Sequence, residues 1–206
     1  RLDSAHSVDR IIGDSQSWRD FQSFVAPSTE TEKGRVYERL VQLYLQTDPQ
    51  YTTKLSDVWL LNEAPLETRD LLNLPAQDKG IDLIARTHEG AYWSIQAKYR
   101  ADPNSTLRLG GDGGLATFSS LSFVTCRNIS FGLICAPIDH SVRNIGLLGN
   151  RVSFMGITHW AGLDDDGSVG WQRIKEKIGG GILVPNKIQP YPFQKECATA
   201  VAQYFE

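Results

Sequence analysis

The sequence predicts an α/β domain in which a central mixed β-sheet is flanked by helices. Three observations lead to this prediction. Candidate elements follow one another in the order helix, strands, helix, strand, helix, strand, which is typical of layered α/β domains. The chain has 206 residues, of which 41% are hydrophobic, and can therefore bury one core of ordinary size. No apolar run reaches the roughly 18 to 20 residues of a membrane-spanning helix, so we expect no membrane contact.

The strongest helical pattern of the first half follows a short aromatic segment, Trp18–Val25. Acidic residues within Ser28–Glu32 are typical of the first turn of a helix, where they meet unpaired backbone N–H groups. Apolar residues then recur at helical spacing from Gly34 to Leu45. We expect this helix to end at Asp48-Pro49, because proline disfavours a helical backbone in the residue before it.

Shorter strands and helices alternate over the rest of the chain. We predict a strand at Val58–Leu61, a helix at Leu66–Leu72, a hairpin of Gly80–Arg86 and Tyr92–Arg100, a helix at Ala116–Val124, a strand at Ile129–Cys135, a helix at Ser141–Leu148, a strand at Val152–Ile157 and a helix at Trp171–Ile178. Residues 1–178 are predicted to form one domain. Residues 179–206 begin with glycines and continue with a proline-spaced aromatic segment, which indicates a linker into a further segment.

Charge and cysteine content narrow the function classes. The chain has 21 Lys and Arg against 24 Asp and Glu, a net charge of −3, which argues against a free-standing nucleic-acid-binding protein. Contact with DNA would therefore need a local patch or other domains. Cys126, Cys135 and Cys197 have no metal-type spacing, and the charged N-terminus is unlike a secretory signal. We therefore expect reduced thiols in a cytoplasmic protein.

The segment from Asp78 to Arg100 holds the most informative pattern. His88-Glu89-Gly90 is a three-residue turn that ends in glycine, a favoured hairpin connection because glycine accepts the left-handed conformation. This turn sets a register in which Leu83 faces Ile95 and Asp82 faces Gln96. Strand side chains alternate, so one face is expected to be polar and to hold Asp82, Gln96 and Lys98. The other face is expected to be apolar and to join the core, with Ile81, Leu83, Ala85, Trp93, Ile95 and Ala97.

The polar face suits the hydrolysis of a phosphodiester. That reaction needs an ion of the Mg²⁺ type, held by carboxylate and carbonyl oxygens, and a positive group near the attacking water. Asp82 can bind the ion, the backbone carbonyl of Ala97 can supply a second oxygen, and Lys98 can orient water and stabilise developing charge. The alternative is a partly exposed ion pair of Asp82 and Lys98 on a solvated strand face.

At these residues the sequence resembles the PD-(D/E)xK nuclease superfamily in its Mrr-like branch. Gly80-Ile81-Asp82 and Gln96-Ala97-Lys98 match its GxD…QxK pattern. The resemblance implies a restriction-endonuclease-like fold in which Asp82 is a metal ligand, Gln96 replaces the second acid and Lys98 is the catalytic lysine. It also implies that Glu38, in the helix before the hairpin, adds a carboxylate to the metal or to Lys98. Asp78 is a further candidate acid, with a solvated turn residue as the alternative.

The wider pattern, which adds Lys33-Gly34 and Val58-Trp59, resembles the N-terminal nuclease domain of single-chain, Type ISP-like restriction–modification enzymes. This resemblance implies a Mg²⁺-dependent endonuclease, with Mn²⁺ as a substitute, that cuts foreign double-stranded DNA. The implied partners are a helicase-like motor, a methyltransferase, a target-recognition domain and a second nuclease copy for double-strand cleavage. Gln189–Gln194 resembles the beginning of such a motor, and ATP would serve only that motor, whose nucleotide-binding loop the sequence lacks.

Two other functions stay open. Gln96 and the net negative charge are compatible with a catalytically silent nuclease fold that binds DNA or assembles other domains. A resolvase or repair nuclease of the same superfamily, acting on branched DNA or ends, is the other alternative. The role of the glycine-rich loop Gly110–Gly114 also stays open, because it lacks the Lys-Ser/Thr of a phosphate-binding loop.

Overall fold

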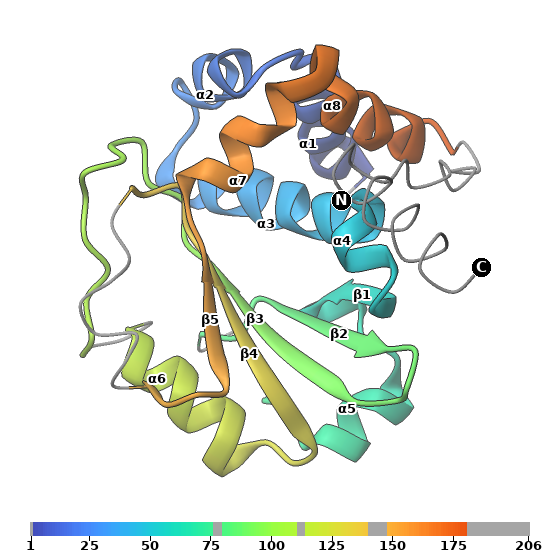
Figure 1. Ribbon diagram of the computed structural model, residues 1–206, viewed down its shortest axis with the longest axis vertical. Coiled ribbons are helices and arrows are strands. Elements are labelled where there is room, and N and C mark those ends of the chain that lie inside the picture. The colour runs from blue at the N-terminus through green and yellow to red at the C-terminus, as the bar shows by residue number, and fades with distance from the viewer. Residues whose placement is uncertain (1, 76–79, 111–113, 140–147, 181–206) are drawn as a thin grey trace, which may run out of the picture.

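The computed structural model describes residues 2–75, 80–110, 114–139 and 148–180. Within these residues, five strands form one mixed sheet in the order β1-β2-β3-β4-β5. Their bounds are β1 Leu55–Leu60, β2 Leu83–Thr87, β3 Tyr92–Ala97, β4 Ile129–Cys135 and β5 Val152–Met155. Strand β2 is antiparallel to β1 and β3, whereas β4 is parallel to β3 and β5. The sheet and its flanking helices (Figure 1) confirm the predicted α/β class.

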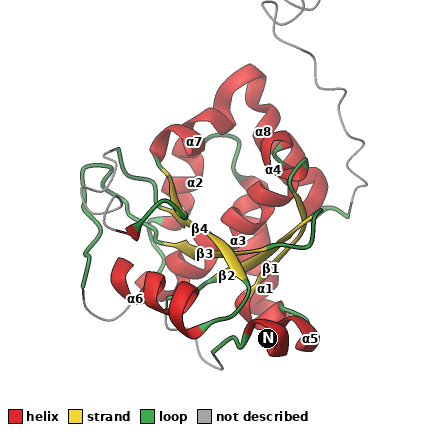
Figure 2. Cartoon of the chain, turned by 60° about the horizontal axis from the view of Figure 1, so that its bottom comes forward, coloured by secondary structure: helices red, strands yellow, loops and turns green. Residues whose placement is uncertain are grey.

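The larger helical layer covers one face of the sheet. Helix α3 lies against this face, where Leu40 and Leu43 belong to one core cluster with Leu83 and Ile95 of the hairpin. Its companions are α1 Leu2–Asp14, α2 Trp18–Val25, α4 Pro49–Thr52, α7 Ile157–Ala161, the 3₁₀-helix Gly162–Asp164 and α8 Asp165–Ile178. Figures 1 and 2 show α7 and α8 on one side of the sheet and α6 on the other.

Helix α3 spans Glu30–Thr47, and local signals determine both of its ends. Thr29 and Glu32 form a capping box: the Thr29 hydroxyl accepts from the Glu32 N–H, and the Glu32 carboxylate accepts from the Thr29 N–H. At the other end, Asp48 has an extended backbone and its side chain caps α4. The predicted end at Asp48-Pro49 is confirmed, and the helix begins one turn earlier than the apolar pattern.

The second face of the sheet is covered by α5 Leu66–Leu72, α6 Leu115–Ser120 and the π-helix Leu121–Thr125 that follows α6. Phe118 of α6 is fully buried in a second core cluster with Ile84 and Ile134. Gly132 of β4 permits this close packing, because a Cβ at that position would lie 3.1 Å from the Phe118 ring and 3.2 Å from the Phe123 ring. Both faces of the sheet are therefore buried.

Several sequence predictions need correction or completion. Helix α1 was not predicted, because its sequence is largely polar; among its described side chains, Ile12 is buried. The predicted strand Val152–Ile157 ends at Met155, since Ile157 begins α7. The predicted helix Ser141–Leu148 lies almost entirely outside the described residues, as does the C-terminal segment 181–206. In the part of the chain that the structure describes, no helix is long and apolar enough to cross a membrane.

Candidate active site

The register of the hairpin is confirmed for Leu83, which pairs with Ile95, and for Thr87, which donates its N–H to the carbonyl of Ala91 at 2.8 Å. The predicted pairing of Asp82 with Gln96 is wrong, because the strand pairing ends at Leu83 and the Asp82 N–H donates to the Ile95 carbonyl. The predicted apolar face is confirmed for Leu83, Ala85, Ile95 and Ala97, which pack in the cluster under α3, with Trp93 partly buried against it. The placement of Ile81 on that face is wrong, since it packs in the cluster under α6. The reason is that the chain enters regular strand geometry only at Leu83.

Asp82 lies where the ladder between β2 and β3 ends. Its N–H donates to the carbonyl of Ile95 at 2.9 Å, although Ile95 is already the partner of Leu83, and its own carbonyl accepts from the Leu61 N–H at 2.8 Å. Two residues further along β3, the Ala97 N–H donates to Oδ2 of Asp82 at 2.6 Å. The carboxylate thus accepts from the Ala97 N–H in place of the backbone carbonyl of a neighbouring strand. The hydrogen bond is short and charge-assisted.

The backbone carbonyl of Ala97 lies on the same side of β3 as this carboxylate. The Ile95 carbonyl is directed toward β2, since it accepts from Asp82. Backbone groups repeat every two residues along a strand, so the Ala97 carbonyl has the same direction. Asp82 and Ala97 therefore present two of the predicted oxygen donors at one end of the hairpin.

The solvated-face alternative for this hairpin is wrong. Asp82 is 6% exposed and Gln96 is 0% exposed. Gln96 lies near α6, since a Cβ on Gly80 would lie 3.3 Å from its Nε2 and 3.7 Å from the backbone nitrogen of Phe118. Ser94, on the same strand, is equally buried and donates to Ser122 of the π-helix at 2.8 Å. The Gln96 amide lies close to the chain before Asp82, where Nε2 donates to the Gly80 carbonyl at 3.0 Å.

Lys98 follows directly after β3 and is half-buried. Its N–H donates to the Cys135 carbonyl on β4 at 2.8 Å, which fixes the backbone at this residue. The next residue, Tyr99, packs its ring against Tyr37 of α3, with 5.7 Å between ring centroids, and against Phe21 of α2 at 6.4 Å. The structure therefore places Lys98 directly after the hairpin, one residue before a ring that packs against α2 and α3.

The two other predicted carboxylates are less closely defined. Glu38 is half-buried on α3, and its Oε1 lies 3.9 Å from the position that a Cβ on Gly34 would take. It belongs to the helix that packs on the Ala97 face of the sheet, and its part in a metal site stays a prediction. Asp78 lies outside the described residues, as do positions 111–113 of the glycine-rich loop.

Two buried groups behind the site were missed by the sequence reasoning. Cys135, the register partner of Ala97, is fully buried, and this burial together with the charge of Asp82 raises the pKa of its thiol far above the ordinary value. Burial likewise raises the pKa of Tyr37 well above its ordinary value, with smaller contributions from Cys135 and Tyr99. Both groups stay protonated at neutral pH, so neither adds negative charge behind Asp82.

The predicted metal ligands are oxygen atoms, of the kind that hard divalent ions prefer, and few of them come from side chains. Among the described residues, no three His, Cys, Asp or Glu side chains are grouped so as to hold a metal. The predicted set differs in kind, since it combines the Asp82 carboxylate with the main-chain carbonyl of Ala97 and adds Glu38. Carboxylate and carbonyl oxygens are the ligands that Mg²⁺ prefers, and water completes its coordination in proteins.

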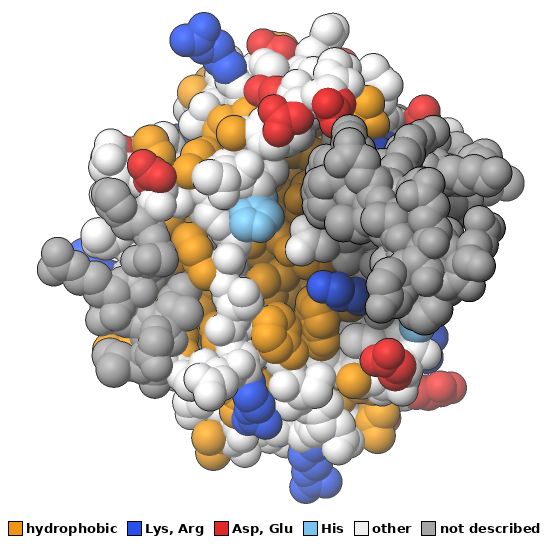
Figure 3. All heavy atoms as spheres, viewed as in Figure 1, with side chains coloured by type: hydrophobic (Ala, Val, Ile, Leu, Met, Phe, Trp, Pro, Cys, Tyr) orange, Lys and Arg blue, Asp and Glu red, His pale blue; other side chains and the backbone are white. Residues whose placement is uncertain are grey.

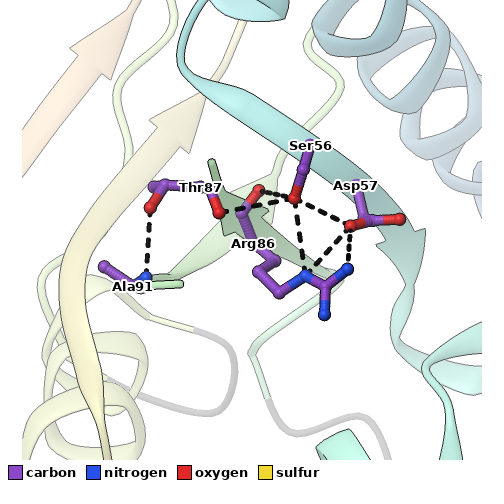
Figure 4. Close-up of polar contacts among 5 residues, drawn as sticks. All are labelled: Ser56, Asp57, Arg86, Thr87 and Ala91. Atoms are coloured by element: carbon purple, nitrogen blue, oxygen red, sulfur yellow. Dashed lines mark hydrogen bonds and ion pairs between the residues drawn. The ribbon is translucent and has the colours of Figure 1, made fainter. Parts of the chain in front are cut away.

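The opposite end of β2 holds a second polar cluster, shown in Figure 4. Ser56 is an extra residue in β1, between the pairs formed by Leu55 and Asp57, and its hydroxyl donates to the Arg86 carbonyl at 3.1 Å. Nη2 of Arg86 donates to Oδ2 of Asp57 at 2.7 Å, and this hydrogen bond and charge raise the pKa of Arg86. Ser56, Asp57 and Arg86 thus bind one another at this end of the sheet.

Two comparisons with known proteins gave a match. Residues 46–124, which include Asp82, Gln96, Ala97 and Lys98, match a family model described as restriction endonuclease. A solved structure described as the ATP-dependent Type ISP restriction-modification enzyme LlaBIII bound to DNA matches with a TM-score of 0.56 and 19% sequence identity. The match covers 93% of this chain and 11% of that one. No curated protein gave a significant match. The chain therefore resembles an Mrr-like restriction nuclease and shares its α/β fold with a Type ISP restriction–modification enzyme.

Proposed function

We propose that this chain is a metal-dependent DNA endonuclease domain that hydrolyses phosphodiester bonds, within an ATP-dependent restriction–modification enzyme that acts on foreign DNA in the cytoplasm. The observation that supports this most is the placement of Asp82. Its carboxylate is buried and bound to the Ala97 N–H, one residue before Lys98, inside the region that matches restriction endonucleases.

Each residue of the site has a distinct part in this proposal. The Asp82 carboxylate and the Ala97 carbonyl would hold Mg²⁺ or Mn²⁺, with Glu38 and Asp78 as candidate further ligands. When bound, such an ion polarises the phosphate and lowers the pKa of a water molecule. Lys98 would orient the attacking water and stabilise the negative charge that develops on the phosphate. The hydrogen bond from the Ala97 N–H holds the Asp82 carboxylate in one direction.

The charge of the chain indicates that the chain alone binds DNA weakly. The net charge is −3, and among the described residues on the face that Figure 3 shows, the Lys and Arg side chains are scattered. Affinity for DNA depends largely on neutralised phosphates, so we expect little grip and little sequence preference. Target choice would come from other domains of a longer enzyme, and double-strand cleavage from a second nuclease copy.

The test uses supercoiled plasmid with excess protein and either Mg²⁺ or Mn²⁺. We expect nicking that needs the metal and that Asp82→Ala and Lys98→Ala both abolish. Lys54→Ala is the matched control for Lys98→Ala, because Lys54 is an exposed lysine in the turn before β1. Full activity in either site variant, with cooperative unfolding retained, would refute the assignment of these residues.

A catalytically silent nuclease fold is the second candidate. The small number of carboxylates near Asp82 among the described residues favours it. On this alternative, neither metal would promote nicking, even in a full-length enzyme supplied with ATP. If the full-length enzyme nicks the plasmid and the 206-residue chain does not, the result would instead support a nuclease that depends on its other domains.

A further inference from the structure

The side chain of Gln96 is directed toward the chain that leads to Asp82. It is fully buried on β3, and its Nε2 donates to the Gly80 carbonyl at 3.0 Å. A carbonyl can only accept, so the group facing Gly80 must be a donor, which an amide supplies and a carboxylate does not. This contact links the two residue triplets of the site, Gly80-Ile81-Asp82 and Gln96-Ala97-Lys98.

The segment that Gln96 contacts has an unusual backbone. Gly80 has a φ of +123°, a conformation that favours glycine, and a Cβ there would lie 3.3 Å from Nε2 of Gln96. Asp82 follows before the regular strand begins and is bound by Ile95 and Leu61 through its backbone. Since no continuous ladder holds this segment, side-chain contacts must contribute to its position.

We propose that Gln96 is a positioning residue for Asp82 that acts through its Nε2 donor rather than as a substitute for an acid, a role that rests on the metal-dependent function proposed above. The Gln96 amide holds the Gly80 carbonyl, the short connection from Gly80 places Asp82, and the Asp82 carboxylate then meets the Ala97 N–H. The amide thereby sets the distance between the Asp82 carboxylate and the Ala97 carbonyl, the two groups that would hold the ion.

Gln96→Glu separates this role from that of a weak substitute for an acid. A substitute would be improved by the change, because a carboxylate binds Mg²⁺ better than an amide does. A positioning amide would be disrupted, because the new carboxylate would face the Gly80 carbonyl, acceptor against acceptor, at a position that is fully buried. A second negative charge beside Asp82 would also oppose its ionisation. The two roles thus predict opposite changes in metal affinity.

The experiment titrates the 206-residue chain with Mn²⁺ alone by calorimetry and measures plasmid nicking at each Mn²⁺ concentration. We expect Gln96→Glu to raise the half-saturating Mn²⁺ concentration about 10-fold or more. Gln96→Met, which removes the donor without adding charge, should act in the same direction. Gly80→Ala should do likewise, and its combination with Gln96→Met should be much less than additive, because both break one contact.

Ser94→Ala is the matched control. It removes another fully buried hydrogen bond from the same strand, that to Ser122, without touching Gly80. We expect Ser94→Ala to lower the unfolding temperature and to leave the half-saturating Mn²⁺ concentration unchanged. If the role of Gln96 were purely structural, the Gln96 variants would show this same pattern.

Mn²⁺ binding that is unchanged or tighter in Gln96→Glu and Gln96→Met would overturn the positioning role. Binding by the unmodified chain that Gln96→Glu weakens, without any nicking, would support the positioning role and contradict the nuclease. An unmodified chain that binds no Mn²⁺ would contradict both.

Discussion

A carboxylate lies beside each end of strand β2, Asp57 on β1 at one end and Asp82 just before β2 at the other, and their surroundings differ. At one end, Asp57 is bound by the guanidinium of Arg86 and by Ser56, and both members of the pair reach solvent (Figure 4). At the other end, Asp82 is buried and its carboxylate is bound by a backbone N–H. A neutralised surface pair contributes little stability and offers no charge to a ligand. A buried carboxylate fixed by the main chain presents an oxygen donor in a set direction.

Exchanging each carboxylate for an amide gives the largest expected contrast. Asp82→Asn keeps the shape and an oxygen that can accept from Ala97, yet removes the charge, so we expect nicking to fall at least about 1,000-fold. Asp57→Asn should leave nicking within about 2-fold, since Asp57 lies at the far end of the strand. Single-turnover plasmid assays at saturating Mn²⁺ measure both. Equal losses in the two variants would remove the distinction between the ends.

Burial of the Asp82 end depends on α6. Phe118→Ala would remove a fully buried ring from the cluster that covers Gln96 and Ile84, and should lower the free energy of unfolding by about 3–5 kcal/mol. Urea denaturation followed by tryptophan fluorescence measures this change. A loss below about 1 kcal/mol would mean that α6 does not close this face in solution.

The close approach of α6 and the π-helix to β4 gives a smaller effect. Gly132→Ala would place a Cβ 3.1 Å from the Phe118 ring, so we expect the rings to shift and about 1–3 kcal/mol of stability to be lost. Gly90→Ala, in the hairpin turn, serves as a comparison. A Cβ there would meet open space, so the positive φ of Gly90 is the main feature that alanine would not suit. If thermal unfolding shows a stable Gly132→Ala protein, the rings do not pack as tightly as described.

The exposed end of β2 should tolerate change best. Arg86→Ala breaks the pair with Asp57 and the contact with the Trp59 ring, and we expect the smallest loss of stability of these variants, because the pair is exposed to solvent. The loss should shrink as salt is raised, because exposed charges are screened. Unfolding measured at low and high salt tests this, and an effect that is large and independent of salt would contradict it.

Much of the fold follows from local sequence patterns. The capping residues around α3, the glycine-ended turn of the hairpin and the apolar run of β4 each specify an element through contacts close in sequence. Helix α5 and strand β4 accordingly have the bounds predicted. Helix α1 was missed because its position depends on distant contacts, such as the ion pair of Asp9 with Arg39.

The sequence by itself determined the fold class, the register of the hairpin and the residue types gathered at its end. Alternation of side chains and the length of one turn were sufficient for that. Only the tertiary structure decided that α6 buries the polar face, that Ile81 leaves the apolar face, and that Gln96 meets Gly80 while Asp82 meets Ala97. The physical reason is that regular periodicity ends at Asp82, where packing and hydrogen bonds from other elements set the backbone.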